Sequence, residues 1–220
     1  MKRIMQVKIL LLAIMIALMV NSAYAAPVTS LPGGTVIPIP GVNYPGSGPQ
    51  TFGPGNSITW TSTNGVGYFG YTANWGFTNN GHWDGSLGPM AGVNDMGNSM
   101  TFAFSTPVQG VGGFINYVPV EGVAPATIAV YDSQMNLIES QPLTFTTSAT
   151  SVNSGFFLGF LENSPEIKYF TLSRNYIGIT TLTTTNGEIP TPEFPSTVLP
   201  VTMIIGFLGA VLYIQRTREH

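Results

Sequence analysis

Few side chains in the central part of this chain are of the types that catalysis requires. The carboxylates between residues 27 and 188 are Asp84, Asp95, Glu121, Asp132, Glu139, Glu162, Glu166 and Glu188, and the single histidine there is His82. A glycosidase holds two carboxylates about 5 to 10 Å apart across a cleft, and nothing in the sequence brings such a pair together. His82 precedes Asp84 by two residues, but no nucleophile-elbow motif accompanies them. The sequence therefore predicts a domain that is not an enzyme.

Ligand binding is the better candidate function, and an aromatic stretch carries it. The segment GYFGYTANWGFTNNGHWDG, residues 67–85, places aromatic rings among glycine and asparagine. Flat rings stack on the apolar faces of sugars, and amide groups pair with hydroxyls. Trp75, Trp83 and Asp84 are the candidate glycan-binding residues. The alternative is that the rings fill a glycine-rich core, with Trp83 and Asp84 in a turn, and the sequence favours this alternative because aromatic residues dominate such cores.

A polar loop offers oxygen atoms that calcium could bind. Asn94, Asp95 and Asn98 lie close together in AGVNDMGNSM, but no bidentate Glu follows at the offset of a known calcium loop. A turn held by Asx side chains is the preferred interpretation. The sequence predicts neither a metal nor another cofactor.

Short alternating segments indicate the elements that would position these residues. Strands are expected near 57–62, 99–105, 111–118, 126–132, 143–147, 155–161, 167–173 and 177–185, and a turn at 132–136 is expected to join two strands. Glycine, proline, asparagine and aspartate separate them. Eight to ten strands without helices predict an all-β fold, an antiparallel β-sandwich of jelly-roll type over residues 57–188. The Pro/Gly-rich segment 26–56 is expected to be a largely extended lead-in, with one edge strand near 36–39.

The N-terminus has the pattern of a secretory signal peptide over residues 1–25. A basic start, with Lys2, Arg3 and Lys8, precedes an apolar run at 9–20, and Ala23 and Ala25 supply the small residues of a cleavage site. The chain has no cysteine, so an exported domain could not be stabilised by disulfides and must rely on burial and sheet pairing.

The C-terminus has the pattern of a membrane segment. Residues 198–214 carry no charge and would form a helix of about 25 Å, slightly short for a hydrocarbon core of about 30 Å. Arg216 and Arg218 lie in the tail, 215–220, and are expected to remain in the cytoplasm. The preceding segment 189–197 holds Pro192, Glu193 and Phe194 between prolines that favour an extended backbone. The alternative that remains open is a lectin-like or weakly hydrolytic module held in the membrane by an uncleaved single-span helix.

The order of these C-terminal parts resembles the tripartite sorting signal of archaeal surface proteins, the PEF-CTERM signal, which is similar to the bacterial PEP-CTERM signal handled by exosortases. Pro192, Glu193 and Phe194 carry the motif, residues 198–214 the helix, and Arg216 and Arg218 the tail. The resemblance implies that an archaeosortase-type enzyme cuts near the motif and transfers the new C-terminus to a membrane lipid. The chain is then expected at the cell surface, on the outer face of the cytoplasmic membrane.

The central part also resembles the sandwich domains that accompany such sorting signals. The resemblance covers roughly residues 60–184, through MTFAFSTPVQGVGGFINYV, ATIAVYDSQMNLIES and GFFLGFLENSPEIKYFTLS. Many of those domains have an acidic residue before the last strand, whereas this chain has Ile179-Thr180-Thr181-Leu182 there. The resemblance implies a fold and a location, and it implies no activity.

The charge balance limits the partners. Residues 27–188 hold eight carboxylates against Lys168 and Arg174, and this acidic balance excludes nucleic acid. It suits a structural or adhesive protein of the cell envelope, with envelope glycans or surface-layer proteins as partners. No Asn-x-Ser/Thr sequon occurs, while the threonine-rich stretches leave O-linked glycosylation open.

Overall fold

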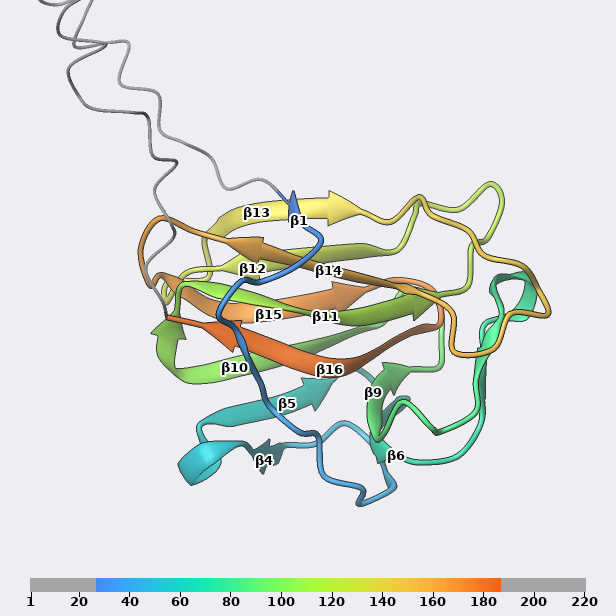
Figure 1. Ribbon diagram of the computed structural model, residues 1–220, viewed down its shortest axis with the longest axis horizontal. Helices are drawn as coiled ribbons and strands as arrows, with labels where there is room; N and C mark the ends of the chain where they lie inside the picture. Colours follow the sequence, from blue (N-terminus) through green and yellow to red (C-terminus); the bar gives the residue numbers. More distant parts are fainter. Residues whose placement is uncertain (1–26, 187–220) are drawn as a thin grey trace, which may run out of the picture. The chain divides into compact units, whose positions relative to one another are not determined.

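The computed structural model describes residues 27–186, which form an all-β domain of antiparallel strands (Figure 1). The expected signal peptide, sorting motif, apolar segment and basic tail lie outside the described residues. Helical structure within 27–186 consists of two 3-10 turns, η1 (Pro54–Asn56) and η2 (Thr78–Asn80). No helix in this part of the chain is long and apolar enough to cross a membrane.

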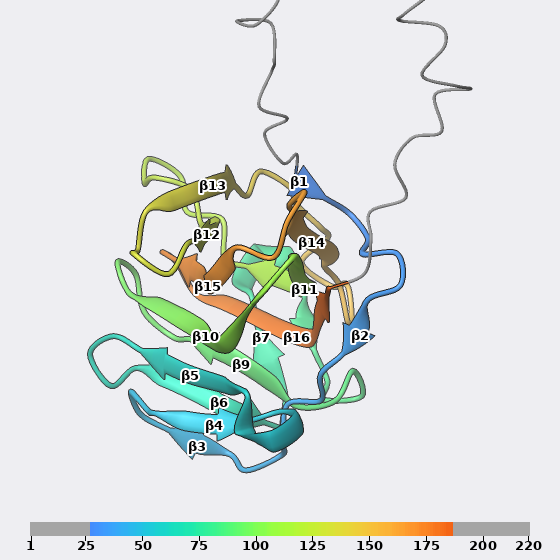
Figure 2. The same cartoon turned by 90° about the vertical axis from the view of Figure 1, so that its left-hand side faces the viewer.

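Two large antiparallel sheets build the domain, and a small hairpin accompanies them. Within residues 27–186, sheet A comprises eight strands, in the order β1 (Pro27–Val28), β14 (Phe156–Leu161), β11 (Gly110–Tyr117), β16 (Ile177–Thr185), β9 (Met90–Val93), β6 (Gly67–Tyr71) and β3 (Tyr44–Pro45), with β2 (Thr35–Val36) also paired to β16. Sheet B comprises β13 (Leu137–Pro142), β12 (Thr127–Tyr131), β15 (Ile167–Ser173), β10 (Ser99–Val108), β5 (Ile58–Ser62) and β4 (Gln50–Phe52). The hairpin joins β7 (Trp75–Gly76) and β8 (His82–Trp83). Figure 2 shows β12, β15 and β10 in one layer, and β14, β11 and β16 in the other.

The main core lies between the two sheets because successive strand residues point to opposite faces. In β10, Met100, Phe102 and Phe104 are all buried on one face. Phe160 of sheet A meets Phe170 of sheet B edge to face, with ring centroids 6.5 Å apart. Rings of the two sheets thus interlock, and the predicted all-β antiparallel fold is confirmed.

The segment 27–56 is built into both sheets. It supplies β1, β2 and β3 to sheet A and β4 to sheet B. Its side chains Leu31, Ile37, Ile39 and Phe52 are buried, and the Ile37 amide donates to the Leu182 carbonyl over 2.7 Å. This segment, expected as a largely extended lead-in, therefore supplies part of the core, through short strands whose alternation is hidden by glycine and proline.

Most expected strands correspond to observed ones, but the strand expected near 143–147 is wrong. Residues after Pro142 leave sheet B and form a loop that extends to Gly155. The Leu143 amide donates to the Ala126 carbonyl over 2.7 Å, and the Tyr117 phenol lies 3.0 and 2.9 Å from the carbonyls of Leu143 and Phe145. Because these carbonyls meet a side chain, the segment does not form a strand there.

Two strands of sheet A, β6 and β9, were not expected from the sequence. Their pairing shifts register between Phe69 and Tyr71, at Gly70. Gly70 has a φ of 66°, and a Cβ there would lie 2.0 Å from the Pro40 carbonyl oxygen. This bulge needs glycine, and it breaks the alternation by which a strand is recognised.

Candidate functional site

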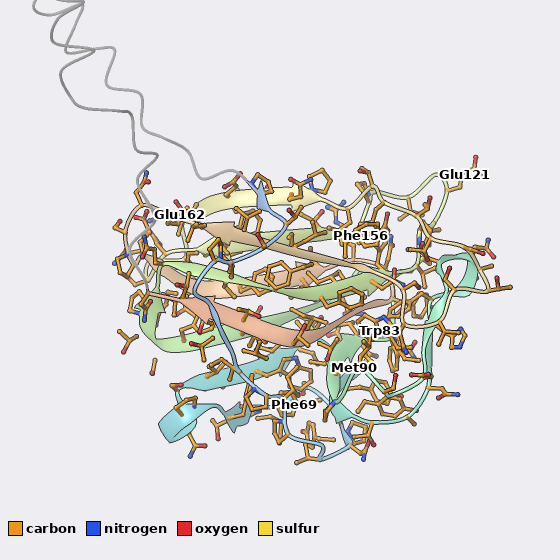
Figure 3. The ribbon with its side chains drawn as sticks, in the orientation of Figure 1. Phe69, Trp83, Met90, Glu121, Phe156 and Glu162 are labelled. Carbon is orange, nitrogen blue, oxygen red and sulfur yellow. The ribbon has the colours of Figure 1, made fainter. Side chains whose placement is uncertain are left out.

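The aromatic stretch forms a second hydrophobic cluster. Trp75, Phe77, Trp83, Met90 and Val118 are its buried members. They lie on the face of sheet A that is turned away from the main core, since the neighbours of Met90 in β9 belong to that core. Figure 3 shows Trp83 close to Met90. The segment around the β7–β8 hairpin therefore covers sheet A from outside.

The two tryptophans are packing residues in this structure. Trp75 is 7% exposed and Trp83 is 2% exposed. The Trp83 indole donates to the Ser154 carbonyl over 2.7 Å, and its ring meets Phe77 edge to face at 4.8 Å. Neither tryptophan presents an open ring face for sugar stacking. Both tryptophans therefore lie in a hydrophobic core, in agreement with the alternative that the sequence favoured.

Glycine makes room for these rings. A Cβ at Gly178 would lie 3.0 Å from Trp83 and 3.2 Å from Phe77. Gly92 is similarly close to Met90. The glycines of β9 and β16 thus let large aromatic rings approach the sheet backbone.

Asp84 is an exposed turn residue beside this cluster. Its carboxylate accepts from the Ser86 amide over 2.9 Å, and its own amide donates to the Asn153 side chain over 3.1 Å. Hydrogen bonds from Ser86, and then from Asn153, lower the pKa of Asp84 to about 2. Asp84 is therefore ionised at neutral pH, and its recorded hydrogen bonds stabilise a turn.

The asparagine-rich loop at 94–98 holds itself by hydrogen bonds. The Asp95 carboxylate accepts from the Met96 amide over 2.7 Å and from Asn98 over 2.9 Å. The side-chain carbonyl oxygen of Asn98 in turn accepts from the side chains of Thr63 and Asn64. Among the described residues, no group of three or more His, Cys, Asp or Glu side chains is arranged to hold a metal. The Asx-turn interpretation fits these contacts.

The expected turn at 132–136 is likewise held by hydrogen bonds to an aspartate side chain. The Asp132 carboxylate accepts from the amides of Gln134 and Asn136 over 2.8 Å each, and from the Asn136 side chain over 2.8 Å. These bonds, that of the Asn136 side chain foremost, lower the pKa of Asp132. The turn joins β12 to β13, as expected.

A buried network of amide and hydroxyl groups fixes the loop at 143–155. Asn80 and Asn116, both fully buried, are joined through an Asn80 side-chain donation over 2.8 Å. Asn80 also accepts from the amide and hydroxyl of Thr147, and Ser154 donates to the Asn80 carbonyl over 3.2 Å. We call these four residues the asparagine network. It ties the loop to η2 and to β11.

The fixed loop forms one wall of an open cleft, which we call the side cleft. The cleft lies where the edge strand β13 of sheet B faces β14 of sheet A, and its lining residues are Thr29, Gln141, Pro142, Leu143, Thr144, Phe145, Phe156 and Leu158. Its volume of about 190 Å³ is below the roughly 300 to 1,000 Å³ of pockets that enclose small ligands. The side cleft can therefore hold part of a larger ligand, such as one ring of a polymer.

An exposed aromatic ring stands in the side cleft. Phe156 is 49% exposed, and its ring meets Phe145 edge to face at 4.8 Å. Phe145 in turn meets Tyr117 at 5.1 Å. The Gln141 amide and the Thr144 hydroxyl supply polar groups in the same lining. The lining of the side cleft thus combines the Phe156 ring, which Phe145 supports, with hydrogen-bonding groups. None of the lining side chains is titratable.

Two glutamate carboxyl groups are shielded from water, and their pKa values are raised. Glu162, directly after β14, is 5% exposed, and burial, with smaller effects of the charges of Glu166 and Glu139, raises its pKa to about 7. Burial also raises the pKa of Glu139 on β13. The sequence alone gives no signal for the burial of these two groups.

Phe156 and Phe145 were not predicted from the sequence as binding residues. Phe156 belongs to a predicted strand, in which a phenylalanine is normally assigned to the core. Its exposure results from its place at the first position of β14, beyond the edge of the core. The remaining predicted site residues, Ala23, Ala25, Pro192, Glu193, Phe194, Arg216 and Arg218, lie outside the described residues.

The described residues thus form a domain of two antiparallel sheets, with an open cleft between the strands β13 and β14. No family model matches the chain, and no curated protein matches it. Among solved structures, the chain is similar to CsCBM6-3 from Clostridium stercorarium in complex with cellobiose, at 13% identity, over 58% of this chain and 87% of the other. The TM-score of 0.33 is too low to establish a shared fold.

Proposed function

We propose that this chain is an exported adhesive protein of the cell envelope, a non-catalytic, jelly-roll-like sandwich that binds glycan in the side cleft. The observation that carries the proposal is Phe156, a ring 49% exposed and supported edge-on by Phe145. The apolar face of a sugar ring would stack on Phe156. Gln141 and Thr144 would donate to and accept from its hydroxyl groups.

The charges of the domain support a neutral glycan as the ligand. Lys168 and Arg174 are the sole lysine and arginine in residues 27–186, and neither lines the side cleft. A sulfated or uronic polysaccharide would therefore find no cation in the cleft to pair with its acid groups. A neutral chain has no such requirement.

The lining of the side cleft also supports binding without turnover. Hydrolysis of a glycosidic bond uses a pair of carboxyl groups beside the scissile bond. The lining residues are threonine, glutamine, proline, leucine and phenylalanine, none of which serves as an acid or base near neutral pH. Loss of polysaccharide upon incubation with the pure protein would contradict this part of the proposal.

The binding proposal is tested with neutral oligosaccharides on a glycan array, followed by calorimetry on the best ligand. We expect Phe156→Ala to weaken glycan binding by about tenfold or more. A nucleic-acid base stacked on an aromatic side chain contributes about 1 to 3 kcal/mol, and we expect a sugar ring stacked on Phe156 to contribute a similar amount. Met96→Ala is the matched control, because Met96 is 48% exposed in a different loop. Equal binding by both variants, or an array without any signal, would contradict the proposal.

The attachment to the membrane belongs to the same proposal. The Pro192-Glu193-Phe194 motif, the apolar run and the basic tail support processing by an archaeosortase-type enzyme and linkage to a lipid. Intact mass spectrometry of the protein from its native membrane tests this. A mass from Ala26 to about Glu193 plus a lipid is expected, whereas a mass that extends through His220 would leave an uncleaved single-span protein.

A further inference from the structure

Two glutamate carboxyl groups each have a buried oxygen atom without a hydrogen-bond partner. Oε1 of Glu162 and Oε2 of Glu139 are both buried and unpartnered, and the whole Glu162 side chain is 5% exposed. Figure 3 shows Glu162 at the end of the sandwich far from Glu121. We call Glu139 and Glu162 the carboxyl pair. A buried carboxylate without a partner is costly, so this pair requires an explanation.

The fold brings the carboxyl pair together from two different sheets. Glu162 follows the last residue of β14 in sheet A, and its amide donates to the Gln109 carbonyl over 2.9 Å, which fixes its backbone. Glu139 lies opposite Val130 in the β12–β13 ladder. Because directly paired residues share a face and Val130 is in the main core, Glu139 points inward. Strands β13 and β14 line the side cleft together, through Gln141 of one strand and Leu158 of the other. The two strands that lead to the carboxyl pair therefore lie next to each other.

Within residues 27–186, neither of the two basic side chains is paired with these carboxyl groups. Lys168 lies in the neighbouring strand β15, but its ammonium group donates to the Ser105 carbonyl over 2.8 Å. Arg174 follows the other end of β15. Glu166, in the same turn as Glu162, adds a further negative charge. The local charge is therefore negative, with two inward-facing oxygens available for a cation.

We propose that the carboxyl pair binds a calcium ion, which links edge strand β13 of sheet B to the turn that leads from β14 of sheet A to β15 of sheet B. Calcium takes six to eight oxygen ligands in flexible geometry and accepts carbonyl and water oxygens beside carboxylates, so two carboxyl groups suffice when other oxygens complete the shell. Magnesium requires near-ideal octahedral geometry and is expected to bind less well. This site is distinct from the loop at 94–98, whose Asp95 carboxylate already accepts from Met96 and Asn98.

The site is expected to be weak and to stabilise the fold. Two carboxylates give less charge than a calcium-sensor loop, so a Kd of roughly 10⁻⁴ to 10⁻³ M is expected, as in other extracellular modules. Calcium that binds the folded state alone raises the melting temperature by mass action. At 10 mM calcium we expect a rise of about 3 to 8 °C in a domain of this size.

The test uses the purified full-length chain in detergent at pH 8, first treated with EDTA and then supplied with calcium chloride. Thermal melts and calorimetric titration with calcium are recorded for the unaltered protein and for Glu162→Gln, Glu139→Gln and Glu121→Gln. Glu121→Gln is the control, because Glu121 is an exposed loop residue. Glutamine keeps the size of the side chain and removes the buried charge, so the Glu162 variant is expected to fold.

The expected result is a calcium-dependent rise in the unaltered protein and in Glu121→Gln that falls below 1 °C in both carboxyl-pair variants, with matching loss of the binding heat. Absence of the rise in the unaltered protein would overturn the proposal. A rise of equal size in Glu162→Gln and Glu139→Gln would show that calcium binds elsewhere and would overturn it as well. Because sugar is absent from these measurements, the result is independent of glycan binding.

Discussion

At the scale of single residues, Glu162 illustrates how an end-of-strand charge becomes buried. The pairing of β14 with β11 continues to Glu162, whose amide donates to the Gln109 carbonyl over 2.9 Å. The side chain thereby loses water, and burial raises its pKa from 4.5 to about 7. In the absence of a bound cation, the folded protein then holds a proton that the unfolded chain releases between these two pH values.

The direction of the resulting pH dependence follows from linkage. Below about pH 4.5 the carboxyl group is protonated in both states, so it contributes no penalty, and above about pH 7 the full cost of the buried charge applies. In EDTA we therefore expect the free energy of unfolding to fall by about 2 to 3 kcal/mol from pH 5 to pH 8, and Glu139 acts in the same direction. Urea denaturation across this range measures the fall, and Glu162→Gln should remove most of it. A profile unchanged by Glu162→Gln would contradict the prediction.

Trp83 is buried and Phe156 is half exposed, so the two residues are expected to contribute differently to the stability of the fold. Trp83→Ala is expected to lower the free energy of unfolding by about 3 to 5 kcal/mol, since it leaves a cavity beside Phe77 and removes the donor to Ser154. Phe156→Ala is expected to cost about 1 kcal/mol, the value of one exposed aromatic pair. Denaturant unfolding of both variants measures the difference. A small loss for Trp83→Ala would return that tryptophan to the candidate binding residues.

At the scale of elements, sequence alternation predicted the central strands well. The run in β10 alternates between buried and less buried residues over its first six positions, and β15 does so from Phe170 to Ser173. Strand β12 instead buries three residues in a row. The loop after Pro142 could not be told from a strand, because threonine and phenylalanine favour strands locally and the competing Tyr117 phenol is distant in sequence. Burial of the carboxyl pair likewise depends on contacts between sheets, as does the exposure of Phe156.

The same long-range contacts make the asparagine network important for the loop at 143–155. Asn80→Ala removes the side chain that donates to Asn116 and to the Tyr117 carbonyl and accepts from Thr147. Several buried polar groups lose their partner, at about 1 to 3 kcal/mol each, so a loss of at least about 3 kcal/mol is expected. Hydrogen exchange should show faster exchange at the Thr147 amide.

A matched control exists for this prediction. Asn74→Ala changes an asparagine that is exposed and does not have a positive φ. Surface substitutions of this kind change stability by about 0.5 kcal/mol or less. If the two asparagine variants melted at the same temperature, the network would not be needed to hold the loop.

At the scale of the whole molecule, the absence of cysteine leaves burial as the main source of stability. The core is assembled from both ends of the described chain, since β1 pairs with β14 and β2 pairs with β16. The N-terminal segment up to η1 supplies the buried side chains of Leu31, Ile37, Ile39 and Phe52. The sequence did not predict this role, because short strands broken by proline carry little periodicity.

The N-terminal segment is therefore expected to be indispensable for folding. A chain that begins at Ser57 lacks β1 to β4 and four buried apolar side chains, and each lost side chain alone is worth about 2 to 5 kcal/mol. Together these losses, about 8 to 20 kcal/mol, are as large as the roughly 5 to 15 kcal/mol by which domains are stable. Near-ultraviolet circular dichroism of this chain should show no cooperative melting, whereas an otherwise identical chain that begins at Pro27 should melt cooperatively. Similar melting temperatures for the two chains would instead mean that residues 57–186 form a complete core without the preceding strands.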